Sequence, residues 1–239
     1  MLSFFYMPYW WVVIPGALLA MWAQFRLRSA YADYSQVGTE SGMTGGQAAR
    51  EILDRNGLRS VGIEEVEGEL TDHYDPTKRT VFLSAASYEG NSVASVGVAA
   101  HEVGHALQHK DAYGPLGLRM ALVPITGIAS RMAGIVVFIG FALSFVKGFL
   151  GLGSIFMWGG IGLFSVLAFF QIVTLPVEYD ASRRAKEQLV RLGMVSDRER
   201  DGVENMLNAA ALTYVAALAT SLLELLKWIL LARSRDDNR

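Results

Sequence analysis

The sequence predicts an α+β chain: a mainly helical integral membrane protein that carries a small domain with a β-sheet. Charged residues make up only 18% of the 239 residues, whereas soluble domains have about 25%. Residues 1–25 and 148–177 contain no Asp, Glu, Lys or Arg. Each stretch exceeds the roughly 20 residues with which a helix crosses the hydrocarbon core of a bilayer. Membrane helices therefore explain both stretches better than buried helices of a soluble protein.

The distribution of charge divides the chain into five regions. Residues 1–25 are expected to be an uncleaved membrane anchor, because basic residues follow its apolar run, whereas a signal peptide has them before it. Aromatic residues near its start are typical of a membrane interface: Phe4, Phe5, Tyr6, Tyr9, Trp10 and Trp11. The other regions are a polar domain (26–119), a transmembrane helical hairpin (120–177), a polar helical segment (178–204) and a fourth membrane helix (205–232). The last region could instead pack against the polar domain.

The tip of the transmembrane hairpin is predicted at Lys147, where a charge and several glycines interrupt the apolar sequence. The two spans then lie near 124–146 and 154–175. Arg131 is expected to lie near an interface, to snorkel toward it, or to face the protein interior. Pro176 suits the first turn of a new helix after the second span.

The polar domain is expected to combine short strands with helices. Thr44 and Gln47 fit a capping box at the start of an amphipathic helix. The predicted elements after residue 60 are a strand at 61–67, a β-hairpin formed by 70–75 and 79–84, a loop at 88–92 and a helix at 93–110.

Composition narrows the classes of site and partner. The chain has no cysteine, which excludes a disulfide framework and any thiolate metal site. A net charge of −2 and the lack of a basic run with interleaved aromatics argue against a nucleic-acid surface. A transition metal bound by this chain must be held by His, Asp or Glu.

The sequence HEVGH at residues 101–105 has the pattern of a zinc site on a helix. His101 and His105 are four residues apart, so both imidazoles lie on one helical face and can bind one ion. Glu102 lies about 100° around the helix from His101, where its carboxylate can take a proton from a water polarised by the metal. This arrangement predicts peptide hydrolysis with Glu102 as the base.

A catalytic zinc usually has three protein ligands and one open position, and two residues could supply the third ligand. His109 follows His105 by four residues, but a ligand so close on the same straight helix would strain a tetrahedral geometry. Glu178 comes from a separate helix directly after a membrane span. We favour Glu178, although an acid there would also suit the positive end of a helix.

Three segments together resemble the YugP-like family of membrane zinc metallopeptidases: HEVGHALQ at 101–108, DHYDP at 72–76 and PVEYDASRRA at 176–185. The chain is more distantly similar to HtpX-type membrane proteases, which share HExxH and a downstream Glu on a later helix. The resemblance implies a gluzincin-like core in which His101, His105 and Glu178 bind one Zn²⁺ per chain. The expected partners are a polypeptide substrate and a lipid bilayer, and no nucleic acid.

The chain departs from the HtpX-type pattern at one position. Ser182 stands where those proteins have an Asp after Glu-x-x-Ala, so Asp180 could instead orient a zinc-bound histidine. Tyr179, His73 and His109 are weaker candidates for contacts in the transition state, because packing explains them as well. Residues Thr80, Val81, Phe82, Leu83 and Ser84 are expected to form an edge strand onto which substrate adds.

We expect a zinc-dependent endopeptidase acting on membrane or misfolded proteins, located in the membrane of a prokaryotic cell. The alternative is a catalytically silent membrane scaffold or metal-binding regulator, although a structural site would not need Glu102 beside its ligands. Basic residues place the catalytic side in the cytoplasm, because they flank the polar domain and follow the third span, at Arg26, Arg28, Arg119, Arg183, Arg184, Lys186 and Arg191. Basic residues at the C-terminus weaken this orientation: Arg233, Arg235 and Arg239.

Overall fold

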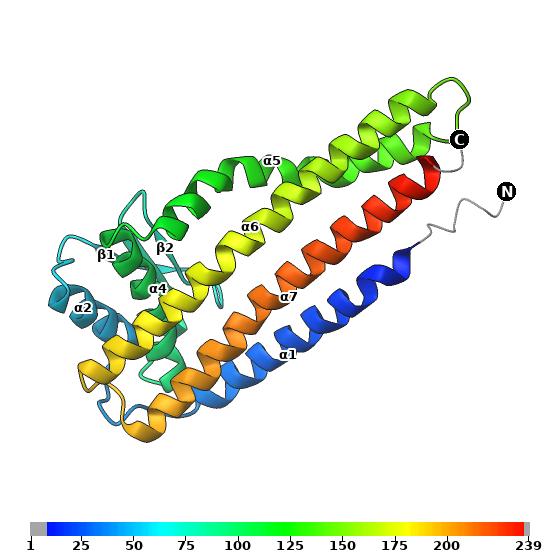
Figure 1. Ribbon diagram of the computed structural model, residues 1–239. Coiled ribbons are helices and arrows are strands. Elements are labelled where there is room, and N and C mark those ends of the chain that lie inside the picture. Colours follow the sequence, from blue (N-terminus) through cyan, green and yellow to red (C-terminus); the bar gives the residue numbers. More distant parts are fainter. Residues whose placement is uncertain (1–8, 237–239) are drawn as a thin grey trace. The chain divides into compact units, whose positions relative to one another are not determined.

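A computed structural model describes residues 9–236 of the chain (Figure 1). The aromatic residues predicted at an interface therefore fall partly outside the described residues, since Phe4, Phe5 and Tyr6 precede them, and Arg239 follows them. The chain forms two compact units. Of the described residues, unit 1 contains 9–22, 118–175 and 214–236, and unit 2 contains 23–117 and 176–213.

Unit 1 is built from long apolar helices. Four helices contribute to it: α1 (Ile14–Ser35), which continues the short helix η2 (Trp10–Val13), and α5 (Gly114–Leu143), α6 (Leu150–Arg191) and α7 (Asp197–Asp236). Part of each helix lies in unit 2. Among residues 9–236, these four helices are long and apolar enough to cross a membrane. Large apolar side chains such as Met21, Ile128 and Ile155 are 64–69% exposed, which fits helices that face lipid rather than water.

Small residues let the helices of unit 1 approach one another closely. A Cβ atom on Gly140 of α5 would lie 2.5 Å from the backbone nitrogen of Met157 on α6. One on Gly160 would lie 2.2 Å from a side-chain carbon of Val137. Glycine at such helix crossings is typical of packing within membranes, where close van der Waals contact holds helices together. The described part of the hairpin tip, between Leu143 and Leu150, agrees with the predicted turn at Lys147.

Unit 2 contains a three-stranded sheet with helices packed against it. Its complete elements are α2 (Gly45–Arg55), β1 (Gly62–Val66), β2 (His73–Asp75), β3 (Thr80–Ser84), α3 (Ala85–Glu89) and α4 (Val93–Lys110). Parts of α1, α5, α6 and α7 also belong to it. The strand order is β1-β3-β2, with β1 parallel and β2 antiparallel to β3.

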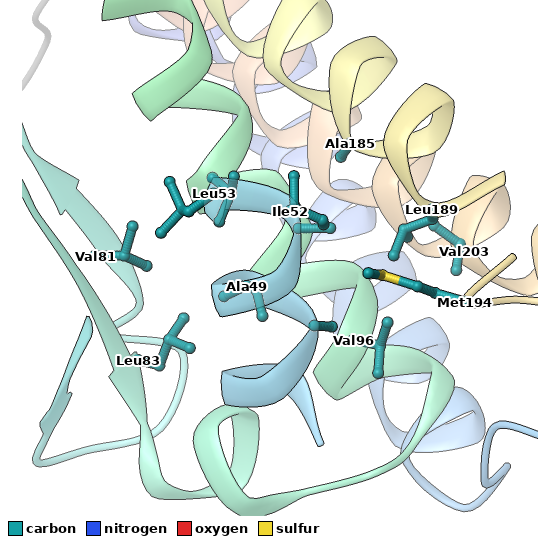
Figure 2. Close-up of a cluster of buried hydrophobic side chains, with 14 of the residues drawn as sticks. Ala49, Ile52, Leu53, Val81, Leu83, Val96, Ala185, Leu189, Met194 and Val203 are labelled. Atoms are coloured by element: carbon teal, nitrogen blue, oxygen red, sulfur yellow. The ribbon is translucent and has the colours of Figure 1, made fainter. Parts of the chain in front are cut away.

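The core of unit 2 joins the sheet to α2, α4, α6 and α7. Figure 2 shows Ile52 and Leu53 of α2 between Val81 of β3 on one side and Leu189 of α6 on the other. The apolar face of α2 predicted from the sequence is therefore buried in this core. Because α4 and α6 share the core, it fixes the two helices that carry the candidate metal ligands.

Several predictions for unit 2 are confirmed. Thr44 and Gln47 form the capping box, with Thr44 accepting a hydrogen bond from the Gln47 backbone nitrogen and Gln47 accepting one from that of Thr44. Helix α4 spans the predicted residues 93–110. The β-hairpin forms from β2 and β3, and β1 lies within the predicted strand 61–67.

The prediction that Thr80–Ser84 is an edge strand is wrong. This strand, β3, lies in the centre of the sheet and pairs with both β1 and β2. Val81 and Leu83 of this strand are fully buried. Such burial is consistent with a central position in the sheet, because an edge strand has a neighbouring strand on one side only. The hairpin was recognised from local sequence, but the parallel pairing with β1 joins segments that no short turn connects.

Two further boundaries differ from the prediction. Pro176 does not begin a helix but lies inside α6, which continues from Leu150 to Arg191. A proline in a helix removes one hydrogen-bond donor, and packing on both sides can hold the helix together; Val173 and Val177 are both buried. The predicted loop at 88–92 is shortened, because α3 extends to Glu89.

Candidate metal centre

Helix α4 presents the two histidines of HEVGH, and close packing against α6 fixes their position. Ser92 caps the helix by accepting a hydrogen bond from the Ser95 backbone nitrogen. Gly104 lies between the two histidines, and a Cβ atom there would be 2.5 Å from the backbone oxygen of Ala181 on α6. Only glycine allows α6 to approach this side of α4 so closely.

Glu178 of α6 lies against both histidines. Its Oε2 atom is 3.2 Å from Nε2 of His101 and 3.5 Å from Nε2 of His105. The three candidate ligand atoms all lie within 4.8 Å of one another. A tetrahedral zinc with bonds of about 2.0–2.2 Å separates its ligand atoms by roughly 3.4 Å. The donor set and its spacing therefore fit a zinc ion.

The electrostatics of this cluster favour a positive charge. Burial alone lowers the pKa of His105, but its hydrogen bond to Glu178 and the charges of Glu178 and Glu102 outweigh burial and raise this pKa above its usual value. Glu178 itself is almost completely buried. A buried carboxylate is costly unless a cation or donors face it, so the site is suited to a metal cation.

Glu102 directly follows His101 on α4, and its side chain is buried. Its negative charge is one of the causes that raise the pKa of His105. Within the described residues, the metal-ligand cluster consists of His101, His105 and Glu178 and does not include Glu102. The structure thus buries the side chain of Glu102 on the helix that carries both histidines, outside the group of three candidate ligands.

Each histidine also has a contact on its other ring nitrogen. Nδ1 of His101 is 3.1 Å from Oγ of Ser182, and Nδ1 of His105 is 3.0 Å from Oε1 of Gln108. With Nδ1 occupied in this way, both Nε2 atoms are directed toward Glu178. The contact of Gln108 was not predicted from the sequence, although this residue ends the HEVGHALQ motif about one helical turn after His105.

His109, the alternative third ligand, is not part of the described cluster. Its Nδ1 atom is 2.9 Å from the hydroxyl oxygen of Tyr74, on β2. Burial raises the pKa of Tyr74 above its usual value. The structure therefore brings Glu178, and not His109, to the two histidines of HEVGH.

The DHYDP segment mainly builds the hairpin. Asp72 accepts a hydrogen bond from the Ser84 backbone nitrogen at 2.8 Å, and Asp75 accepts one from that of Thr77 at 2.8 Å. His73 is exposed and stacks on Phe82, with 4.9 Å between ring centroids. Among the described residues of this segment, Tyr74 is the one with a hydrogen bond to α4.

Asp180 and Tyr179 lie beside Glu178 on α6 but in different surroundings. Asp180 accepts a hydrogen bond from Nε2 of Gln108 at 3.0 Å, so its connection to His105 runs through Gln108. It also pairs with Arg183 and Arg184. Tyr179 is 48% exposed, and the metal-ligand cluster of the described residues does not include it.

Comparisons with known proteins give one family and one curated relative. The sequence matches the family described as "Putative neutral zinc metallopeptidase" over residues 9–233. It is 49% identical to the "Putative membrane protease YugP" of Bacillus subtilis (strain 168), over 92% of this chain and 95% of that protein. No solved structure matches the chain significantly. The family match spans nearly the whole chain and includes the residues of the candidate metal centre, and we conclude that this protein belongs to the neutral zinc metallopeptidase family and is a hydrolase.

Proposed function

We propose that this protein is a membrane endopeptidase that hydrolyses peptide bonds of membrane or misfolded proteins. We further propose that His101, His105 and Glu178 bind one Zn²⁺ per chain and that Glu102 is the general base. The observation that carries this proposal is the convergence of three ligand atoms from two helices, within 4.8 Å of one another. The carboxylate of Glu102 is buried on α4 directly after His101.

Zinc bound at this centre would polarise the scissile carbonyl and lower the pKa of a water molecule. Glu102 would accept the proton of the attacking water and then give it to the amine that leaves. Its place on α4, directly after His101, supports this role. Glu178 and the two histidines would hold the ion and leave one position open to water and substrate.

The four apolar helices and the name of the Bacillus relative support a location in a membrane. We propose that the membrane regions are 1–25, 120–177 and 205–232, and that unit 2 faces the cytoplasm. The basic residues that flank unit 2 support this orientation.

The proposal is tested by Glu102→Gln in the full-length protein, purified in detergent. Because Glu102 is not proposed as a ligand, this variant should keep about as much zinc as the wild type, measured by mass spectrometry. Loss of the base should lower hydrolysis of an unfolded polypeptide by roughly 10²–10⁴-fold. Glu67→Gln, at an exposed position of unit 2, is the matched control and should retain full activity.

Full activity of Glu102→Gln would contradict the proposed mechanism. Stoichiometric zinc in the wild type, without hydrolysis of any soluble or membrane-inserted polypeptide, would instead favour a metal-binding regulatory protein. Unfolded and membrane-inserted substrates are therefore assayed in parallel.

A further inference from the structure

The amide group of Gln108 has a defined orientation within unit 2. This side chain is completely buried on α4. Its Nε2 atom donates hydrogen bonds to the backbone oxygen of Val177 at 2.7 Å and to Oδ2 of Asp180 at 3.0 Å. Both partners are oxygen acceptors, so only the NH₂ end of the amide can face them. The carbonyl oxygen Oε1 must consequently face Nδ1 of His105, 3.0 Å away.

This orientation determines the tautomer of His105. Because Oε1 of Gln108 only accepts hydrogen bonds, Nδ1 of His105 must carry the proton and donate it. In the neutral ring, the other nitrogen, Nε2, then has a free lone pair. Nε2 is the atom that lies 3.5 Å from Glu178.

We propose that Gln108 is a positioning residue that selects the tautomer of His105 able to bind zinc and that fixes the direction of its ring. This inference rests on the proposed role of His105 as a zinc ligand. In the same way, hydrogen bonds from groups that are not ligands orient histidines in many metal sites.

One ion pair within α6 and one between α6 and the end of α4 hold Gln108 in place. Asp180 accepts from Gln108 and also from Nε of Arg184, at 2.6 Å. Arg184 reaches back to Asp111 at the C-terminal end of α4, at 2.5 Å. The contacts therefore form a closed path from α4 to α6 and back, which also fixes Glu178 relative to the histidines.

His101 has no comparable arrangement on its other nitrogen. Its partner there is Oγ of Ser182, at 3.1 Å. A hydroxyl group can donate or accept, so this contact is compatible with either tautomer of the ring. Substitution of Ser182 should therefore weaken zinc binding less than substitution of Gln108.

The test measures metal binding by the full-length protein in detergent. Gln108→Leu should bind zinc about 10–100-fold more weakly in competition with a chelator. With Co²⁺ in place of zinc, the visible absorption bands of this variant should differ from those of the wild type, because they report the geometry of the ligands. Gln188→Leu removes a glutamine of α6 that bonds to Asn56, and it should leave both measurements unchanged.

A second variant tests whether a hydrogen-bond acceptor beside His105 is sufficient for normal zinc affinity. Gln108→Glu keeps an oxygen for Nδ1 of His105 but turns its other oxygen toward Val177 and Asp180, which are acceptors. It should therefore fail to restore zinc affinity. Affinity equal to that of the wild type would overturn the role of the path through Asp180.

Asp180→Asn covers the case in which Gln108→Leu does not fold. This variant keeps an oxygen acceptor for Gln108 and weakens the link to Arg184, so zinc affinity should fall, but less than in Gln108→Leu. Unchanged affinity and an unchanged Co²⁺ spectrum in the folded variants would refute the inference. That result would leave the proposed peptidase intact, because Glu102→Gln tests it by hydrolysis; conversely, the metal measurements decide the role of Gln108 even if no substrate is cleaved.

Discussion

At the scale of single residues, the third ligand is the assignment with the clearest consequence. Glu178→Ala removes an oxygen that lies within 3.5 Å of both histidines. It should weaken zinc binding by more than the roughly 100-fold that loss of a contact outside the ligand set can cost, and hydrolysis should stop. His109→Ala removes only the partner of Tyr74, so zinc and much of the activity should remain. Metal content by mass spectrometry on both purified variants checks this, and the opposite pattern would show that the assignment is wrong.

The sequence was sufficient to predict which residues come together, but not how they are held. Spacing placed His101 and His105 on one helical face, and the need for a ligand from a separate helix favoured Glu178. The contacts of Gln108 and Ser182 could not be predicted, because each depends on the rotation of α4 against α6. Asp180, suggested from the sequence to orient a zinc-bound histidine, contacts Gln108, which in turn contacts His105; its role stays a prediction.

At the scale of elements, the approach of α4 to α6 is the feature most open to a direct test. Gly104→Ala would place a methyl group 2.5 Å from the backbone oxygen of Ala181. Backbone cannot rotate away as a side chain can, so the helices must separate, at a cost of about 1–3 kcal/mol. The temperature of thermal unfolding and the zinc content should both fall. Gly117→Ala, on α5 with open space around it, should leave both unchanged or raise stability slightly; equal behaviour of the two variants would contradict close packing at Gly104.

The elements were predictable where local sequence determines them. Helix α4 and the capping box of α2 follow from helix-start residues and from apolar spacing. The central place of β3 was missed because its pairing with β1 joins distant segments. The continuation of α6 through Pro176 was missed because a proline usually marks a boundary, and only burial of Val173 and Val177 on both sides shows why the helix persists.

At the scale of the whole molecule, the orientation in the membrane is the prediction to test. The chain has no native cysteine, so single cysteines can be labelled without background. Ser60→Cys and Thr77→Cys lie at exposed positions of unit 2, and they should react with an impermeant thiol reagent only after cell lysis. Lys147→Cys, at the exposed hairpin tip, should react in intact cells. The reverse pattern would place the metal centre outside the cytoplasm.

The strand order places β1 at an edge of the sheet, and this has a consequence for aggregation. Exposed strand edges can pair with those of other molecules, and charged side chains are a common protection against it. Glu64 and Glu65 are exposed on β1, so two copies of this edge carry like charges and repel each other. The acidic sequence of this strand, which has no part in the metal centre, can thus keep neighbouring copies of the protein from associating through their sheets.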